Sequence, residues 1–388
     1  MKHVALIIET SRSYGRELLR GVKRYISEHG HWSVFVEIRD LESAPPLWLE
    51  SWKGDGILTR SGNAATYRAV TRTGVPAIEL RATRFGSGLP FMGIDNVEIG
   101  RLVAQHFLDR GFRHFGVYEL DTEEFFIERR DSFIRTLAER GYHCASHRQE
   151  QRTEKPLDWE LQQAELLKWI GQLPRPVGIL ACTDQLGCWL LDACRRAGAR
   201  VPEEIAVVGA ENDESLCEMS LPPLSSVRFG GERLGYLAAQ HLDALMHGKR
   251  ASKPHLILPP DGIIVRQSSD VVAVSDEWLS AALSTIRLRA CSGLTVQALL
   301  EEVPISRSKL ERGFREILGR SPNTEINRVR LDRVKELLRD TDLNLDQIAT
   351  RTGFASQHYL IDLFGRTFGL TPGAFRRQAK LGHRSAPE

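Results

Sequence analysis

The sequence predicts an α/β domain with parallel sheets, followed by an all-α domain. Over the first 266 residues, apolar runs of strand length alternate with segments of helical periodicity. Strands separated by helix-length segments are typical of parallel sheets built from βαβ units. The last third shows helical patterns only, and one of its segments repeats at an offset of 50 residues without a gap. We therefore expect two domains of different class in one chain.

The composition is that of a globular protein. The 388 residues are 42% hydrophobic and 26% charged, whereas a disordered chain would have fewer apolar residues and a larger net charge. The longest apolar runs have strand length and the start has no signal-peptide pattern, so we expect neither a membrane-spanning helix nor secretion. The six cysteines form no C-x-x-C pair. We expect reduced thiols, no zinc cluster and a cytoplasmic protein.

The charge is distributed unevenly along the chain. The formal net charge is only +2, but residues 271–388 hold 18 Lys/Arg and 14 Asp/Glu, a net of +4, which leaves −2 for residues 1–270. This difference is small, but its sign suits a C-terminal domain that binds nucleic acid.

The elements of the first domain follow in order. The predicted strands are Val4–Ile8, Ser33–Ile38, Gly56–Leu58, Ala77–Leu80, His114–Tyr118, Val177–Ala181, Ile205–Val208 and Gly262–Val265. Helical spacing is found at Leu18, Leu19, Val22 and Ile26, and in the segments Val97–Asp109, Arg129–Glu139 and Gln185–Arg196. We interpret residues 267–277 as a linker, so that the first domain spans residues 1–266 and the second residues 278–384.

The repeat relates Thr295–Pro322 to Leu345–Pro372. Six pairs of positions are identical: Gln297/Gln347, Ser306/Ser356, Leu310/Leu360, Phe314/Phe364, Gly319/Gly369 and Pro322/Pro372. In each copy a short helix (Val296–Glu302 or Leu345–Thr352) leads through a turn into a longer helix. The serines stand where an N-cap is needed, and the glycines where a helix ends in a left-handed residue. Each copy therefore predicts a helix-turn-helix unit, at about residues 295–318 and 345–368.

The second helix of such a unit can enter a major groove, where its outward side chains reach base edges. The residues expected to face bases are Arg307, Ser308, Glu311 and Arg312 in the first unit, and Gln357, His358, Tyr359 and Ile361 or Asp362 in the second. The residues expected to contact phosphate are Arg315, Arg320, Arg366 and Arg376. The alternative is a plain helical bundle with a polar exposed face.

The tandem units resemble the AraC-type family of transcription regulators. A long helix, Glu325–Arg339, joins them, and Gly369-Leu370-Thr371-Pro372-Gly373-Ala374-Phe375-Arg376 matches the ending of that family. The resemblance implies that each recognition helix enters a successive major groove of double-stranded DNA. Many members carry a basic residue where Asp362 stands, so we expect this carboxylate either to weaken phosphate binding or to accept from a cytosine amino group.

The first domain lacks the motifs of nucleotide-binding enzymes. No G-x-G-x-x-G follows the first strand, and no P-loop is present. No nucleophile–base pair or metal-ligand cluster stands out, so we expect neither an enzyme nor a bound cofactor.

The order of its elements resembles the periplasmic-binding-protein-like sensor of LacI-type repressors. The matching segments are 55–58, 93–96, 110–114, 182–184, 201–209 and 224–227. Because the first predicted strand starts at residue 4, we expect the usual N-terminal DNA-binding headpiece to be absent. The resemblance implies two βαβ lobes with a ligand site between them, so the fold expected for the whole chain is a two-lobed periplasmic-binding-protein-like domain followed by a double helix-turn-helix domain.

The same resemblance implies a set of ligand-binding residues at strand ends. They are Ser13, Tyr14, Arg16, Arg130, Asp184, Glu211 and Asn212. The family commonly has Asp where Glu211 stands, and the extra methylene lengthens the reach by roughly 1.5 Å. Other roles stay open: Asp184 as a helix cap, Arg130 as an ion-pair partner of Asp131 or Glu128, and Tyr14 as an aromatic between the lobes. Asp95 is expected to cap the helix that follows it.

A LacI-type sensor ahead of an AraC-type reader is the architecture of the xylose-operon regulator family, which the whole chain resembles. The resemblance implies a cytoplasmic homodimer that binds a pentose such as xylose and DNA, acts with RNA polymerase and activates catabolic genes. One alternative is a solute-binding or scaffold protein whose helical tail docks to a protein. Another is a sugar-processing enzyme, against which the missing catalytic residues argue.

Overall fold

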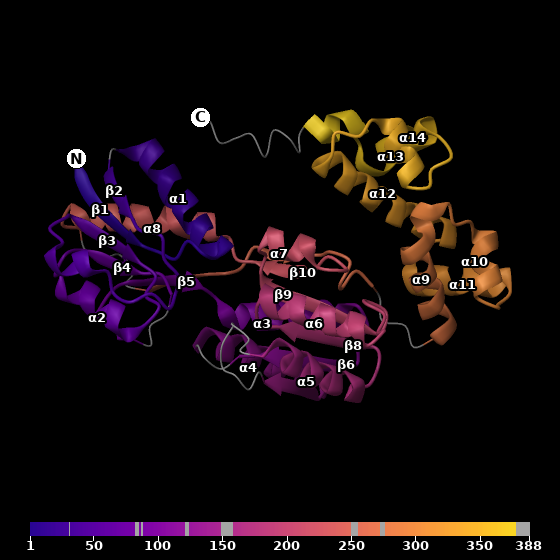
Figure 1. Cartoon of the computed structure of the whole chain (residues 1–388), viewed down its shortest axis with the longest axis horizontal. Coiled ribbons are helices and arrows are strands. Elements are labelled where there is room, and N and C mark those ends of the chain that lie inside the picture. The colour runs from indigo at the N-terminus through magenta and orange to yellow at the C-terminus, as the bar shows by residue number, and fades with distance from the viewer. Residues whose placement is uncertain are drawn as a thin grey trace. The chain divides into compact units, whose positions relative to one another are not determined.

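The computed structural model of the chain forms two compact units, Met1–Val271 and Val272–Glu388 (Figure 1). It describes residues 1–30, 32–81, 85–86, 88–120, 124–148, 158–249, 255–271 and 276–377. The first unit is α/β and itself consists of two lobes. The second unit is all-α.

The N-lobe of the α/β unit is built on a sheet of six parallel strands. Their order is β11-β5-β4-β3-β1-β2. The strands are β1 (Lys2–Ile7), β2 (Trp32–Val36), β3 (Gly56–Thr59), β4 (Ala77–Glu79), β5 (Phe91–Ile94) and β11 (His255–Leu258). The helices are α1 (Ser13–His29), α2 (Ala64–Arg72), α8 (Gly231–Met246) and the 3-10 helix η1 (Leu47–Ser51). Helices α1 and α8 pack closely because Gly21 has no side chain. A Cβ at this position would lie only 2.0 Å from the carbonyl oxygen of Glu232.

The C-lobe is built on a second six-stranded sheet, of order β12-β10-β9-β8-β6-β7. Its strands are β6 (His114–Glu119), β7 (Cys144–Arg148), β8 (Val177–Ala181), β9 (Ile205–Glu211), β10 (Ser225–Arg228) and β12 (Gly262–Ile264). Its helices are α3 (Asn96–Asp109), α4 (Glu124–Ala138), α5 (Trp159–Gln172), α6 (Asp184–Arg196) and α7 (Glu214–Met219). All pairings are parallel except that of β12 with β10, which is antiparallel. The sequence pattern did not predict the direction of this last strand.

The chain passes between the lobes after β5, after β10 and after β11. The two-lobed architecture with parallel sheets is therefore confirmed. Because parallel strands end at one edge of their sheet, each lobe gathers its strand-end loops at that edge, which is where ligands bind in such folds.

The all-α unit contains two helix-turn-helix pairs around a long central helix. Its elements are α9 (Glu277–Arg289), the 3-10 helix η2 (Ala290–Ser292), α10 (Val296–Glu302), α11 (Arg307–Leu318), α12 (Pro322–Asp340), α13 (Leu345–Arg351) and α14 (Gln357–Phe368). One core cluster joins the middle of α12 to α13 and α14 through residues including Val334, Ala349, Leu360 and Phe364. The predicted helix pairs and the joining helix are thus confirmed.

The ends of the recognition helices have the predicted caps. The hydroxyl of Ser306 accepts from the backbone N–H of Lys309 at 3.3 Å, and that of Ser356 from Tyr359 at 3.2 Å. Gly319 and Gly369 end α11 and α14 with φ values of 67° and 71°.

Candidate ligand site and nucleic-acid interface

Charged side chains stand at the carboxyl ends of three neighbouring N-lobe strands. Glu9 follows β1, Arg60 follows β3 and Glu79 ends β4. Glu9 and Arg60 form a buried ion pair. Glu79 accepts through Oε1 from the backbone N–H groups of Ser61 at 3.1 Å and Arg81 at 2.9 Å. These contacts fix one oxygen of each carboxylate and leave the other available.

The C-lobe contributes the end of β9. Glu211 and Asn212 adopt φ values of 111° and 54°, a left-handed conformation that is costly for residues other than glycine. Asp184 supports this turn, because its carboxylate accepts from the backbone N–H of Asp213 at 2.7 Å and from the hydroxyl of Ser226. Backbone strain of this kind is found mostly at functional sites.

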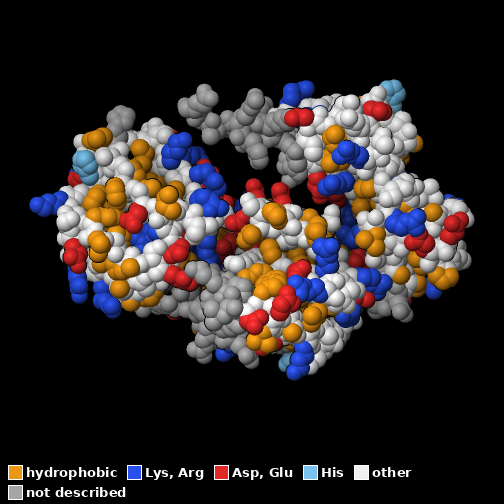
Figure 2. Space-filling model, viewed as in Figure 1, with side chains coloured by type: hydrophobic (Ala, Val, Ile, Leu, Met, Phe, Trp, Pro, Cys, Tyr) orange, Lys and Arg blue, Asp and Glu red, His pale blue; other side chains and the backbone are white. Residues whose placement is uncertain are grey.

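Contacts between the two lobes join these strand ends. Arg12, just before α1, donates to Glu211 at 3.3 Å, and the Arg16 guanidinium lies 3.9 Å from the Asp213 carboxylate. The ring of Tyr14 meets the edge of Phe229 at 5.5 Å between centroids. Figure 2 shows charged side chains of both signs along the border between the lobes. We call the residues that meet there the inter-lobe site.

Arg129 is the most enclosed cation of this site. It donates to Asn96 at 2.8 Å and to the Cys182 carbonyl at 2.9 Å. Its guanidinium lies over the rings of Phe125 and Phe229, at 5.1 and 4.8 Å. Burial lowers the pKa of Arg129 below its usual value, although the Glu211 carboxylate opposes this. Arg129 itself lies in α4, and its bond to the Cys182 carbonyl holds the guanidinium beside the end of β8.

Five polar atoms of the inter-lobe site are buried without a hydrogen-bond partner among the described residues. They are Glu9 Oε2, Ser13 Oγ, Arg60 Nε, Glu79 Oε2 and Asn212 Oδ1. A buried polar atom left unpaired costs about 1–3 kcal/mol, so such atoms are rare in native proteins and need an explanation. Four belong to the N-lobe and one to the C-lobe.

The structure distributes the predicted ligand-binding residues unevenly. Ser13, Tyr14, Glu211 and Asn212 come together at the inter-lobe site, and Arg16 lies at its rim, where it donates to the carbonyl of Thr10 at 2.8 Å. Tyr14 has the packing role that we considered. Two other predicted residues are already engaged within the C-lobe.

Those two residues are Arg130 and Asp184. Arg130 forms ion pairs with Glu119 and Asp131, the latter being a partner that we considered. The cap of α6 is Thr183 rather than Asp184, because its hydroxyl accepts from Leu186. Asp95 caps α3, as predicted.

Sequence reasoning missed Glu9, Arg60, Glu79, Arg12 and Arg129. For the first three a signal existed: Glu9 directly follows a predicted strand, Arg60 comes two residues after one, and Glu79 is the last residue but one of another. Burial raises the pKa of Glu79 to about 7, and burial likewise raises the pKa of Asp184 to about 8. Carboxyl pKa values perturbed in this way are found mostly at functional sites.

A pocket of about 720 Å³ adjoins the inter-lobe site through Asn212. Residues of α1 and α8, together with Glu214, Arg228, Gly230 and Asp261, complete its lining. Gly230 and Asp261 lie in two of the three segments that connect the lobes, so the shape of the pocket depends on how far the lobes are closed.

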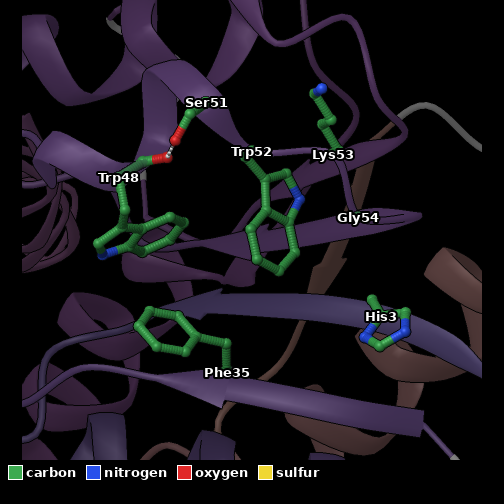
Figure 3. Close-up of a pocket in the computed structure, with 7 residues that line it drawn as sticks. All are labelled: His3, Phe35, Trp48, Ser51, Trp52, Lys53 and Gly54. Atoms are coloured by element: carbon green, nitrogen blue, oxygen red, sulfur yellow. Dashed lines mark hydrogen bonds between the residues drawn. The ribbon is translucent and has the colours of Figure 1, made fainter.

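A second pocket, of about 320 Å³, lies in the N-lobe. Figure 3 shows Phe35 facing the indole rings of Trp48 and Trp52, with His3 and Lys53 at one end. The ring centroids of Phe35 and Trp48 lie 4.8 Å apart, and those of the two tryptophans 5.4 Å apart. None of the predicted ligand-binding residues lines this pocket.

The described part of the chain was also searched for metal sites and for membrane-spanning helices. No group of three His, Cys, Asp or Glu side chains there is placed to hold a metal ion. No helix there is long and apolar enough to cross a membrane.

In the all-α unit, α11 presents a basic surface. Arg307, Arg312 and Arg315 are exposed, and within the described residues none of them forms an ion pair. Ser308 is exposed beside them and Glu311 is half-buried. All the predicted contact residues of the first unit therefore reach the surface.

Helix α14 is less basic. Gln357 is half-buried, whereas His358 and Tyr359 are exposed. The Tyr359 hydroxyl accepts from Asn327 of α12 at 3.4 Å. Asp362, expected to repel phosphate, forms an ion pair with Arg366 one turn later, so that each neutralises the other.

Two further predicted phosphate contacts have partners within the unit. Arg320 forms an ion pair with the buried Glu325. Arg376 donates to the backbone carbonyl oxygens of Leu343 at 2.5 Å and Leu338 at 3.4 Å. Both arginines therefore hold the unit together, whatever else they contact.

Comparisons with known proteins agree with this geometry. Residues 104–269 match the periplasmic binding protein-like domain family, and residues 299–378 match a helix-turn-helix domain family. The xylose operon regulatory protein of Haemophilus influenzae is 29% identical over 381 residues, covering 96% of this chain and 97% of that protein. The Escherichia coli K12 protein of the same name is 27% identical over 381 residues, covering 96% of both.

A solved structure, described as the xylose-binding transcription activator xylR, superposes with a TM-score of 0.80 at 26% identity. The match covers 97% of this chain and 98% of the other. Both domains and their order are therefore shared along nearly the whole length. The chain is thus a homologue of the xylose operon regulatory proteins, and a transcription regulator in which a periplasmic-binding-protein-like domain precedes a helix-turn-helix DNA-binding domain.

Proposed function

We propose that this protein activates pentose catabolic genes in response to a pentose, xylose or a close relative, that binds at the inter-lobe site. The observation that carries the proposal is the set of five buried polar atoms without partners at that site. A polyol supplies hydroxyl groups that both donate and accept, so one ligand can satisfy carboxylate, amide and guanidinium groups together. The names of the homologues support xylose as the first candidate.

The two lobes have different parts in this proposal. The N-lobe offers Glu9, Ser13, Arg60 and Glu79, so most of the hydrogen bonds to the ligand come from one lobe. The C-lobe adds Asn212 and the Glu211 carboxylate, which Arg12 already joins to the N-lobe. A ligand that contacts both lobes favours their closed arrangement through its differential affinity for it.

A thermal-shift and calorimetric screen of pentoses and hexoses tests the proposal. A sugar at 100 times its Kd stabilises the folded unit by about 2.7 kcal/mol. We expect xylose or a related pentose to raise the melting temperature more than glucose does. If no sugar shifts the transition and calorimetry shows no binding, the proposed effector class is wrong.

Ser13→Ala offers a residue-level test. Its hydroxyl has no hydrogen-bond partner among the residues that the structure describes, so its removal should leave the stability of the ligand-free protein unchanged or improve it. The sugar loses one hydrogen bond, and we expect its Kd to rise about tenfold. Ser27→Ala is the control, because Ser27 is exposed on the same helix. Equal Kd values for the two variants would place the sugar elsewhere.

The proposal includes a cytoplasmic homodimer that acts with RNA polymerase and has no enzymatic activity. A dimer doubles the number of DNA-reading helices, which compensates for the modest net charge of each helix-turn-helix domain.

Two experiments test the remaining parts of the proposal. Incubation of the protein with the bound sugar should leave the sugar chemically unchanged. A mobility-shift assay with the promoter beside its own gene, at two salt concentrations, should show salt-dependent binding. A scaffold protein with a protein-docking tail would show none.

A further inference from the structure

The second helix-turn-helix unit has a core of its own. All members of its core cluster lie at Leu331 or later, in α12, α13, α14 and the segments that follow them. The recognition helix of the first unit, α11, packs elsewhere, against Trp278 of α9. A Cβ on Gly313 of α11 would lie only 2.5 Å from that indole ring. The contacts that join the two units therefore decide how one recognition helix is set relative to the other.

The turn of the second unit lies directly against η2, which leads into the first unit. Gly353 forms this turn with a φ of 71°. A Cβ there would lie 2.8 Å from both the carbonyl oxygen of Ala290 and the backbone nitrogen of Gly293. Glycine is thus required for two reasons, the left-handed backbone and the close approach of the two chain segments. Ala290 is fully buried.

Arg330, in the middle of α12, contacts both segments. Its Nε donates to the carbonyl oxygen of Ala290 at 2.9 Å, and its Nη2 to that of Leu294 at 2.9 Å. Its guanidinium also lies over the ring of Phe354, the residue after the turn glycine, at 5.7 Å. A planar guanidinium suits this combination of paired acceptors and a ring, whereas a lysine ammonium does not. We call these four residues, together with Gly353, the joint.

The joint extends to the second recognition helix. The ring of Phe354 is 6% exposed and meets the ring of Tyr359 in α14 at 5.9 Å between centroids. On the side of the first unit, Leu294 directly precedes Thr295, which caps α10. The joint therefore connects the start of one helix-turn-helix unit to the recognition helix of the other.

We propose that Arg330 is a positioning residue that fixes the two recognition helices of one chain relative to each other, and so restricts the chain to DNA sites with one spacing between their two sequence elements. Helices that enter successive major grooves read elements about 10–10.5 base pairs apart. When one helix is bound, a rigid joint holds the other at the next groove, which raises its effective concentration there. A loose joint admits several spacings and binds each of them less tightly.

Selection from random DNA measures the spacing directly. The full chain is incubated with duplexes of about 20 random base pairs, which offer two successive major grooves, and the bound fraction is sequenced. We expect the unmodified chain to select two elements at one spacing. Arg330→Met removes both hydrogen bonds and should select the same elements at spacings spread over several base pairs. Its Kd for the site preferred by the unmodified chain should rise about 10–100-fold. Duplexes that carry either element alone should bind both proteins equally.

Three further variants separate positioning from charge. Arg333→Met removes the same charge from α12, but Arg333 is 52% exposed and paired with Glu336, so spacing and Kd should stay unchanged. Arg330→Lys keeps the charge without the paired contact, so the spacing should remain broad. Gly353→Ala separates the two segments from the other side of the joint and should broaden the spacing as well.

Three results would overturn the role of Arg330. One is a single narrow spacing in either Arg330→Met or Gly353→Ala. Another is an equal rise in Kd on the two-element site and on single elements, together with recovery in Arg330→Lys, which would assign Arg330 to phosphate. The third is selection of only one element by the unmodified chain. Arg330 lies in the other compact unit from the sugar site, so each of these results leaves the proposed effector standing.

Discussion

At the residue scale, Glu79 shows how a buried carboxyl group can serve binding at the expense of stability. Burial raises its pKa from 4.5 to about 7, although two backbone N–H groups stabilise the ionised form. The folded protein therefore holds a proton that the unfolded chain releases between pH 4.5 and 7. Stability falls as the pH rises through this window, and the full cost, about 3 kcal/mol, applies above pH 7.

Glu79→Gln removes this cost. We expect the variant to be more stable than the unmodified protein at pH 8 by up to about 3 kcal/mol, and equally stable near pH 4.5. The free energy of unfolding is measured by urea titration with tryptophan fluorescence. This signal reports mainly on the α/β unit, because six of the seven tryptophans lie in residues 1–271. The sugar affinity should fall in the same variant, because an amide replaces the carboxylate oxygen offered to the ligand.

Glu325→Gln is the control, because the pKa of Glu325 is shifted in the opposite direction to that of Glu79. Arg328 and Arg320 lower the pKa of the buried Glu325, so its contribution to stability is present above pH 4.5 and is lost as the pH falls. We expect the Gln variant to lose helical structure at lower urea concentration at pH 8, with the difference shrinking in acid. A Glu79→Gln variant that is less stable than the unmodified protein at pH 8 would contradict the explanation by burial.

Sequence reasoning chose Arg130, whereas its neighbour Arg129 lies at the inter-lobe site, with its guanidinium over the ring of Phe229. Successive helical residues point in directions about 100° apart, so the choice depends on how α4 is rotated against the sheet. That rotation is set by packing, such as the contact where Gly100 lets α3 approach the Arg129 backbone. A single sequence carries no direct sign of it.

At the scale of the element, the caps were predictable because their cause is local. Ser306, Ser356, Gly319 and Gly369 each act within a few residues of their own position. The strands β7 and β11 were missed for the opposite reason. Both are edge strands of mixed exposure. Polar side chains interrupt the pattern of β7, and the apolar run of β11, Leu256–Leu258, is only three residues long.

Two glycines of α14 test the cap directly. Gly365 lies inside the helix and Gly369 ends it with a φ of 71°, and neither has a heavy atom within 4 Å of an added Cβ. Gly365→Ala should therefore stabilise the helix by up to about 1 kcal/mol. Gly369→Ala should destabilise it by about 1–2 kcal/mol, since alanine is strained in the left-handed region. Hydrogen exchange of peptides from residues 345–368 in the full chain measures both, and changes of the same sign would rule out this account.

The two recognition helices should differ in how they bind DNA. On α11, Arg307, Arg312 and Arg315 have no ion-pair partner within the described residues, whereas on α14 Arg366 is neutralised by Asp362. Arg315→Ala should lower the slope of log affinity against log salt by about 0.9 if it contacts one phosphate. Arg366→Ala, the matched variant, should change the slope less. Mobility shifts at four salt concentrations give both slopes, and equal changes would show that the ion pair opens on DNA.

Arg312 is expected to read a base. If it makes a bidentate contact with guanine, Arg312→Ala should cost about 1–3 kcal/mol on the promoter and much less on random DNA. Competition between the two DNAs separates the roles, because equal losses on both would assign Arg312 to phosphate.

At the scale of the whole molecule, the proposed regulation requires a coupling free energy between sugar and DNA. A sugar held by Glu79 of the N-lobe and Asn212 of the C-lobe favours one arrangement of the lobes, and the reader units of a homodimer follow that arrangement. Thermodynamic linkage makes the coupling reciprocal, so DNA must tighten sugar binding by the factor by which sugar tightens DNA binding.

We expect a factor of about 5–150, corresponding to 1–3 kcal/mol. Calorimetric titration of sugar with and without promoter DNA gives one value, and mobility shifts with and without sugar give the other. Ser13→Ala should weaken sugar binding and leave DNA binding without sugar unchanged. If the two coupling factors differ, the two titrations do not measure the same binding equilibrium. A factor of one in both titrations would show that sugar binding does not affect DNA binding.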